Sequence, residues 1–149
     1  KYKIDTKIVR IFNTYGPMMD KNDGRVVSNF INQAINSKDI TIYGDGNQTR
    51  SFMFISDLVE GMIKAMGVNY NNPINLGNPN EITINELADI VLNFTSSISK
   101  KVYKKLPSDD PKRRKPNIQL AKKILKWQPK VNFNKGLRKT IEYYLKEIN

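Results

Sequence analysis

Arginine is the side-chain type through which this sequence could best bind a charged ligand. Of its 149 residues none is histidine and none is cysteine, which excludes Ser-His-Asp and Cys-His catalysis and thiolate metal sites. Acid–base chemistry is left to carboxylates, tyrosine, lysine and water. A planar guanidinium donates several hydrogen bonds at once, which suits anionic groups. The arginines are Arg10, Arg25, Arg50, Arg113, Arg114 and Arg138.

The lysines carry less information than the arginines. The formal net charge is +11, which can indicate nucleic acid, an anionic membrane or a phosphate-bearing ligand. Lysine is abundant together with asparagine and isoleucine, which is typical of a codon bias. Interleaved aromatic residues and a helix-turn-helix pattern are missing, so no nucleic-acid partner is expected. No apolar run approaches the roughly 18 residues of a membrane helix, so no membrane segment is expected.

Apolar periodicity predicts strands that alternate with helices, as in the α/β class. Ser56 is the predicted N-cap of one helix, and Thr83 with Glu86 forms a predicted capping box for the next. The predicted strands cover 7–12, 40–43, 51–55, 73–77 and 101–106, and the predicted helices cover 26–36, 56–66, 83–94, 118–126 and 135–148.

The first predicted strand needs partners. Ile8, Val9, Ile11 and Phe12 indicate burial on both faces, as in a parallel sheet. The remaining strands are too few to build such a sheet independently. We therefore expect these residues to be the C-terminal part of a larger protein.

Several motifs follow one another in the order of a known family. Over essentially its whole length the chain resembles the C-terminal half of an extended short-chain dehydrogenase/reductase that acts on nucleotide sugars. The segments 22–30 and 114–116 resemble more narrowly the members that decarboxylate UDP-glucuronate to UDP-xylose. The motifs are Arg10-Ile11-Phe12-Asn13-Thr14-Tyr15-Gly16-Pro17, Asn22 to Phe30, Ile42 to Gly46, Gln48 to Phe52, Asn75 to Pro79 and Asp109 to Pro116.

This resemblance implies an α/β fold that is the C-terminal part of a Rossmann-type enzyme. It would contain the last parallel strands and the small substrate-binding subdomain, in an incomplete sheet. Residues 1–149 would bind the nucleotide sugar, and NAD would be the cofactor. The Gly-rich turn and the Tyr-x-x-x-Lys pair of the N-terminal half are not in this sequence. We therefore expect the 149 residues alone to be inactive.

The resemblance also assigns roles to the turn after the first strand. Asn13 would contact the substrate diphosphate or sugar. Thr14, Tyr15 and Pro17 would border the nicotinamide end of NAD. Two structural alternatives stay open. Asn13 could stabilise the turn through its own side chain, and Tyr15 could have a purely structural role in the turn.

The arginines and one strand complete the expected site. Arg25 begins a helix, where a cation is disfavoured unless an anion lies nearby, and the resemblance places it beside substrate and cofactor phosphates. Arg50 would bind the diphosphate, and Arg114 would lie near the diphosphate or the glucuronate carboxylate. Thr41 and Tyr43 would lie along the uracil. The three arginines should therefore share one cavity. A solvated helix start for Arg25 and an ordinary half-buried strand for Tyr43 are the alternatives.

Other functions remain open. The full-length protein could be a 4,6-dehydratase or an epimerase of the same superfamily, or the chain could be a non-catalytic UDP-sugar-binding module. The resemblance implies a homodimer of the full-length enzyme. A cytoplasmic location is expected because no targeting segment is visible, with a lumenal location left open.

Overall fold

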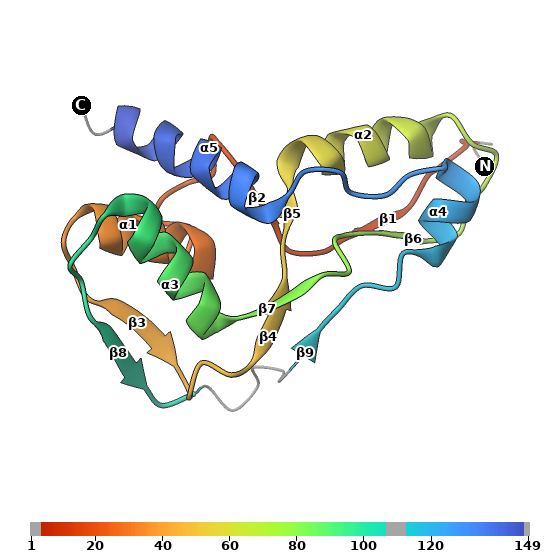
Figure 1. Ribbon diagram of the computed structural model, residues 1–149. Coiled ribbons are helices and arrows are strands. Elements are labelled where there is room, and N and C mark those ends of the chain that lie inside the picture. The colour runs from red at the N-terminus through yellow and green to blue at the C-terminus, as the bar shows by residue number, and fades with distance from the viewer. Residues whose placement is uncertain (1–3, 107–112, 148–149) are drawn as a thin grey trace.

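The computed structural model describes residues 4–106 and 113–147 (Figure 1). The predicted helix end at Ile148 and the motif residues 109–112 lie outside these residues. Within them, short strands join two groups of helices.

One group of helices packs against the first strand pair. Strand β1 (Val9–Ile11) pairs in parallel with β6 (Ile74–Leu76). Helices α2 (Ile55–Met66) and α4 (Gln119–Leu125) pack against this pair. The buried apolar side chains here include Met53, Leu58, Ala65, Leu76, Ile118, Leu125 and Trp127.

The second group is a three-helix layer over another parallel pair. Helices α1 (Val26–Ile35), α3 (Ile84–Thr95) and α5 (Phe133–Lys146) pack together. They cover β3 (Ile40–Tyr43), which pairs in parallel with β8 (Lys101–Lys104). Their core includes Phe30, Ile31, Ile40, Ile42, Leu87, Val91, Leu137, Ile141 and Tyr144.

Very short strands lie between the two groups (Figure 1). Strand β2 (Thr14–Tyr15) pairs in parallel with β5 (Met53–Phe54). Strand β4 (Thr49–Ser51) lies between β7 (Glu81–Thr83), which is antiparallel to it, and β9 (Arg113–Arg114), which is parallel. This region brings the ends of several elements together.

The α/β class and the capping box of α3 are confirmed. The Thr83 hydroxyl accepts a hydrogen bond from the Glu86 N–H at 3.0 Å, and the Glu86 carboxylate accepts one from the Thr83 N–H at 2.7 Å. The Ser56 cap is wrong, because α2 begins at Ile55 and its N-cap is Phe54. Helix α5 also begins earlier than predicted, since the Asn132 side chain accepts from the N–H groups of its first turn.

The first strand is parallel as predicted, and within the described residues it lacks the partners that its expected burial on both faces requires. Ile8 and Ile11 are 47% and 53% exposed. Within the described residues β1 has one strand neighbour, β6, so one of its edges and part of its surface are uncovered. Helix α2, which packs against β1, also has exposed apolar side chains, among them Val59, Met62 and Met66.

Tyr144 ties α5 to the segment that leads into α1. Its hydroxyl donates to the Met19 carbonyl at 2.8 Å. Burial, aided by the nearby Asp23 and Asp20 carboxylates, raises the pKa of Tyr144 to about 12 from an ordinary 10.0. The folded state thus prefers the protonated phenol.

This shift predicts a loss of stability in alkali. The contribution of Tyr144 is complete below pH 10 and disappears as pH rises toward about 12, because the unfolded chain loses the proton first. Denaturant unfolding at stepped pH should show Tyr144→Phe losing less stability over this range than the unsubstituted protein. Burial also raises the pKa of Tyr15, so some loss persists in the variant. Identical pH profiles for the two proteins would contradict the assignment.

Candidate functional site

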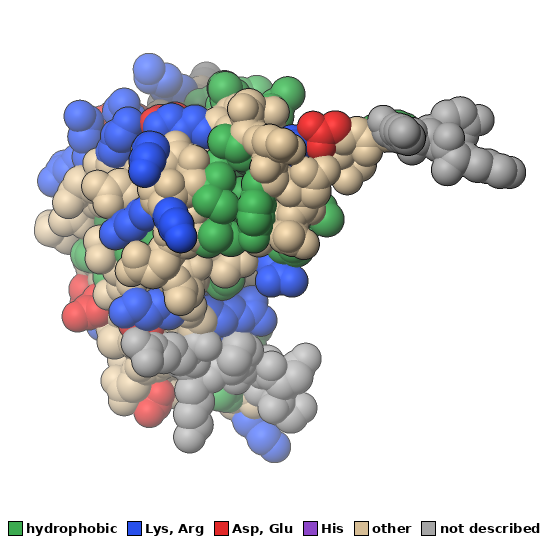
Figure 2. All heavy atoms as spheres, turned by 90° about the vertical axis from the view of Figure 1, so that its right-hand side faces the viewer, with side chains coloured by type: hydrophobic (Ala, Val, Ile, Leu, Met, Phe, Trp, Pro, Cys, Tyr) green, Lys and Arg blue, Asp and Glu red, His purple; other side chains and the backbone are tan. Residues whose placement is uncertain are grey.

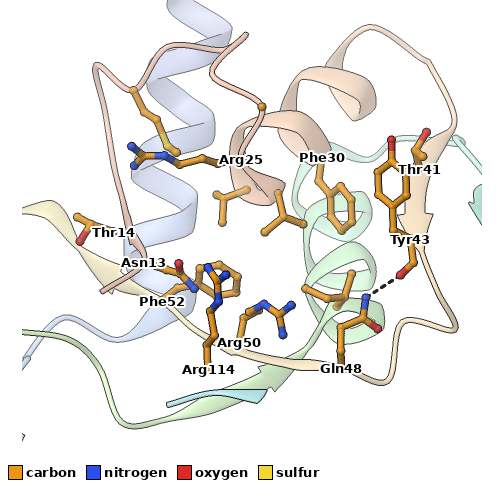
Figure 3. Close-up of a pocket in the computed structure, with 15 residues that line it drawn as sticks. Asn13, Thr14, Arg25, Phe30, Thr41, Tyr43, Gln48, Arg50, Phe52 and Arg114 are labelled. Atoms are coloured by element: carbon orange, nitrogen blue, oxygen red, sulfur yellow. Dashed lines mark hydrogen bonds between the residues drawn. The ribbon is translucent and has the colours of Figure 1, made fainter. Parts of the chain in front are cut away.

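A cavity of about 330 Å³ opens between the start of α1 and the short strands (Figure 3). It receives side chains from the ends of β1 and β3, from the start of α1, and from β4 and β9. Its walls are formed by Asn13, Thr14, Met19, Gly24, Arg25, Val26, Val27, Phe30, Thr41, Tyr43, Gln48, Arg50, Phe52, Ile84 and Arg114.

Strand pairing places two arginines side by side on one wall. Arg50 and Arg114 are register partners in the parallel pair β4–β9, and neighbours of this kind project to the same face. Figure 3 shows their side chains adjacent, close to Asn13 and Phe52. Arg50 is only 7% exposed, and its Nη1 donates to the Thr49 carbonyl at 2.7 Å. Like charges on paired strands repel, so a bound anion would stabilise this arrangement.

Contacts around β4 hold this arginine pair in place. The Ser51 hydroxyl donates to the Arg114 carbonyl at 3.2 Å. On the other edge, the Glu81 carboxylate accepts from the Thr49 hydroxyl at 2.9 Å and forms an ion pair with the Lys115 ammonium at 3.2 Å. The strand carrying Arg50 is thus tied to both of its neighbours.

Arg25 approaches from the opposite wall (Figure 3). It is the N-cap of α1 and has no side-chain capping bond. The Asp23 carboxylate organises this turn: it accepts from the Arg25 N–H at 2.9 Å and from the Ser28 hydroxyl, and it lies 3.4 Å from Arg25 Nε. The Arg25 side chain is 66% exposed. A cation at a helix N-terminus opposes the helix dipole, and the Asp23 carboxylate partly offsets this charge.

Asn13 and Thr14 enter the cavity just beyond the carboxyl end of β1. In open α/β sheets this edge is the usual place for ligands. The backbone here is secured by the Met53 N–H, which donates to the Asn13 carbonyl at 2.9 Å. The Thr14 hydroxyl donates to the Phe12 carbonyl at 2.9 Å. The Asn13 amide lies on the same wall as the arginine pair in Figure 3.

The remaining walls are apolar and aromatic. Phe30, Phe52 and Ile84 line the cavity with Tyr43 and Thr41. Phe52 is held from behind by other rings: its centroid is 6.5 Å from that of Tyr15 and 5.9 Å from that of Phe133. A cavity that combines cationic side chains with flat apolar walls can bind a phosphate ester that carries a planar ring.

Two residues expected beside the cofactor are absent from the walls of this cavity. Tyr15 is 2% exposed, and its hydroxyl donates to the Phe133 carbonyl at 3.0 Å. Tyr15 and Pro17 do not line the described cavity. The structure therefore places the Tyr15 side chain in the core. The other expected residues, Asn13, Thr14, Arg25, Thr41, Tyr43, Arg50 and Arg114, all line the cavity.

Some lining residues were not anticipated as site residues. Gln48 belongs to the motif from Gln48 to Phe52, but the resemblance assigns it no role. The spacing of Phe30 predicts only a place in the helical core. Because Gln48 shares this motif with Arg50, the motif is the sequence feature that could have identified Gln48 as a lining residue. Nothing in the sequence distinguishes Phe30 from its apolar neighbours, because its exposure to the cavity depends on where α1 docks.

No group of three or more Asp and Glu side chains in the described residues is arranged to hold a metal ion. Within those residues no helix is long and apolar enough to cross a membrane.

Comparison of the sequence with protein families gives one clear match. Residues 1–77 match the NAD dependent epimerase/dehydratase family. The chain is 46% identical over 145 residues to UDP-glucuronic acid decarboxylase 1 of Danio rerio, and 50% identical over 134 residues to UDP-glucuronic acid decarboxylase 4 of Arabidopsis thaliana. These alignments cover 97% and 90% of this chain. The chain spans about a third of these relatives' length, 35% and 30% respectively.

Solved structures of UDP-sugar enzymes share the fold. UDP-glucose 4-epimerase of Thermotoga maritima, crystallised with UDP-glucose, superposes with a TM-score of 0.91 at 30% identity. UDP-glucuronic acid 4-epimerase of Bacillus cereus, in complex with UDP-glucuronic acid and NAD, superposes with a TM-score of 0.88 at 28% identity. These matches cover 95% and 98% of this chain, and 46% of each structure.

Proposed function

The chain belongs to the NAD dependent epimerase/dehydratase family, and from this membership we propose that it is the UDP-sugar-binding part of a UDP-glucuronate decarboxylase. The observation that carries the proposal is the convergence of Arg25, Arg50 and Arg114 on one cavity with flat apolar walls. The names of its relatives, which are UDP-glucuronic acid decarboxylases, support the choice of substrate.

In this proposal the arginines bind the diphosphate. Arg50, buried and fixed through Thr49, donates to phosphate oxygens from β4. Arg114 stands beside it in register and binds either the diphosphate or the carboxylate of the sugar. Arg25 closes the anion site from the start of α1. Charge-assisted hydrogen bonds from guanidinium groups are stronger than neutral ones and fix orientation, so these contacts hold the sugar in a defined position. Such positioning lowers the barrier to reaction.

The cofactor would meet this chain at one border only. When bound, NAD supplies reversible hydride transfer to the sugar. Thr14 lines the cavity and is the residue of this chain best placed to contact it, next to Asn13. Tyr15 does not fit that role, since its hydroxyl is committed to Phe133. We propose that the rest of the NAD site, with the Gly-rich turn and the catalytic tyrosine, belongs to an N-terminal Rossmann half.

The exposed apolar surface supports such a second half. Figure 2 shows hydrophobic side chains gathered on the side of the molecule that carries α2, α4 and β1. Val59, Met62, Ile63 and Met66 of α2 are between 40% and 74% exposed, and Ile11 of β1 is 53% exposed. Contiguous exposed apolar patches mark interaction surfaces. We propose that the N-terminal half covers this patch and that the full-length protein forms a homodimer.

The proposal is tested by assaying the full-length protein with UDP-glucuronate and NAD. We expect release of carbon dioxide and formation of UDP-xylose, measured by nucleotide-sugar chromatography. Epimerised UDP-glucuronate without carbon dioxide would identify an epimerase instead, and a 4-keto-6-deoxy product from UDP-glucose would identify a 4,6-dehydratase. Tight UDP binding without turnover of any of these nucleotide sugars would indicate a non-catalytic UDP-sugar-binding module.

A further inference from the structure

An ion pair spans the strand that carries Arg50. Strands β7, β4 and β9 lie side by side in that order (Figure 1). The Glu81 carboxylate, on β7, lies 3.2 Å from the ammonium of Lys115, the residue that follows β9. The same carboxylate accepts from the Thr49 hydroxyl of β4 at 2.9 Å. One acidic side chain therefore connects the two outer strands of this sheet to the central one.

This ion pair lies outside the cavity. Arg114 lines the cavity, and successive side chains of an extended chain point in opposite directions. The side chain of Lys115 therefore points away from the cavity, toward Glu81. Neither Glu81 nor Lys115 is among the described residues that line the cavity, so a ligand bound there does not need to contact them.

The chain is anchored just beyond Lys115. Pro116 is buried, and it packs so closely against Gly77 that a Cβ added to this glycine would lie 2.8 Å from Pro116 Cγ. Strand β9 itself is only two residues long, so few backbone bonds fix it on β4. The position of Arg114 therefore depends also on side-chain contacts next to it. These include the Ser51 hydroxyl, which donates to the Arg114 carbonyl at 3.2 Å, and the ion pair of Lys115.

Charge repulsion opposes the pairing of β9 with β4. Arg50 and Arg114 are register partners with the same charge, and Arg50 is buried, where water screens charges weakly. The Glu81–Lys115 ion pair acts against this repulsion, because it attracts the residue next to Arg114 toward β7, across β4. The Glu81 side chain is 16% exposed, so the attraction is less screened than in a pair on the open surface. The ion pair therefore helps to keep the two guanidinium groups together before an anion binds.

This inference rests on the proposed function, with both Arg50 and Arg114 on the diphosphate of a UDP-sugar. We propose that Glu81 and Lys115 are positioning residues that hold Arg114 beside Arg50 and so preorganise the diphosphate site. The repulsion between the two arginines is then offset within the fold, and less of the binding free energy is needed to bring them together. Preorganisation of this kind raises affinity without an additional contact to the ligand. An acidic residue thus increases the affinity of the site for an anion.

The sign of one substitution separates this role from a general effect of charge. Glu81→Gln removes a negative charge close to the site, but keeps an oxygen that can accept from the Thr49 hydroxyl. If charge alone mattered, the more positive protein would bind UDP more tightly. Because the ion pair positions Arg114, we expect instead that Glu81→Gln weakens UDP binding by about threefold to fivefold, as for the loss of a partly exposed ion pair.

Titration calorimetry of the full-length protein with UDP measures this change in a double-mutant cycle with Arg114→Ala. Since Glu81 acts through Arg114, Glu81→Gln should not weaken UDP binding when the Arg114 side chain is already absent. Lys115→Arg keeps a cation for Glu81 and should retain the affinity. Asp89→Asn is the matched acid-to-amide control. It breaks the ion pair of Asp89 with Lys101, neither of which lines the cavity, and should leave UDP affinity unchanged.

The outcomes distinguish this inference from the proposed function. If Glu81→Gln binds UDP as tightly as the unsubstituted protein or more tightly, or if Arg114→Ala leaves UDP affinity unchanged, the inference fails while the UDP site stands. It also fails if Glu81→Gln weakens binding by the same factor with and without the Arg114 side chain, because the effect then does not act through Arg114. If UDP does not bind the unsubstituted protein, the proposed function fails and the inference fails with it.

Discussion

Replacing Arg50 by alanine in the full-length protein will weaken UDP binding by between about tenfold and a hundredfold. Hydrogen bonds to charged groups contribute about 1.5–3 kcal/mol each, and 1.4 kcal/mol corresponds to about tenfold in affinity. Arg50 is buried, and its guanidinium lies on the cavity wall beside Arg114. It therefore loses little entropy on binding, and water screens its contact with phosphate weakly. Titration calorimetry with UDP measures the change.

Two variants control for charge and for folding. Arg50→Lys keeps the charge but loses the planar fork, and should bind UDP with an affinity between those of the unsubstituted protein and Arg50→Ala. Arg138→Ala removes a guanidinium that lies 3.9 Å from the centre of the Phe94 ring, away from the cavity, and should leave UDP affinity unchanged. An Arg50→Ala protein that melts normally and binds UDP as before would exclude Arg50 from the diphosphate site.

Trp127→Ala should lower the free energy of unfolding by about 3–5 kcal/mol, the usual cost of removing a large buried aromatic ring. Trp127 is 1% exposed and packs in the core between α2, α4 and β6. Its Nε1 donates to the Asp57 carbonyl at 3.0 Å, and the Asp57 carboxylate accepts from the Val131 N–H at 3.0 Å. These bonds join the segment after α4 to the first turn of α2.

Denaturant unfolding of the full-length protein measures this loss. Ile98→Ala removes an apolar side chain that is 93% exposed and should change stability by less than about 0.5 kcal/mol. Trp127→Phe, which fills most of the space but lacks the indole N–H, should fall between the two. A loss below about 1 kcal/mol for Trp127→Ala would mean that the segment is held mainly by other contacts.

The arginine and tryptophan predictions are linked through α5. The segment held by Asp57 and Trp127 leads directly to Phe133, whose ring packs against Tyr15 and Phe52. Phe52 lines the cavity. Damage at Trp127 can therefore reach the apolar wall of the site. Arg50→Ala should change UDP affinity without a comparable loss of stability, and this difference distinguishes a binding residue from a core residue.

The α/β class, most of the helices and strands, the capping box of α3 and the identity of the family could all be predicted from the sequence alone. Each depends on residues close together in the chain or on the order of motifs along it. The 3–4 spacing of Val27, Phe30, Ile31 and Ala34 predicts a buried helix face whatever lies opposite, and all four are buried. The start of α5 shows the limit of this reasoning. Its N-cap, Asn132, depends on the position of the segment that follows Trp127.

How separate parts of the chain meet could not be predicted from local sequence patterns. The strands β2, β7 and β9 are two or three residues long, too short for a periodicity to reveal. Yet the register of β9 on β4 is what sets Arg114 beside Arg50. The packing of α5 turned the Tyr15 hydroxyl toward Phe133 rather than the cavity, and Gln33 reached the β3 edge from another element. These placements depend on contacts between residues distant in sequence, whose energies no local pattern encodes.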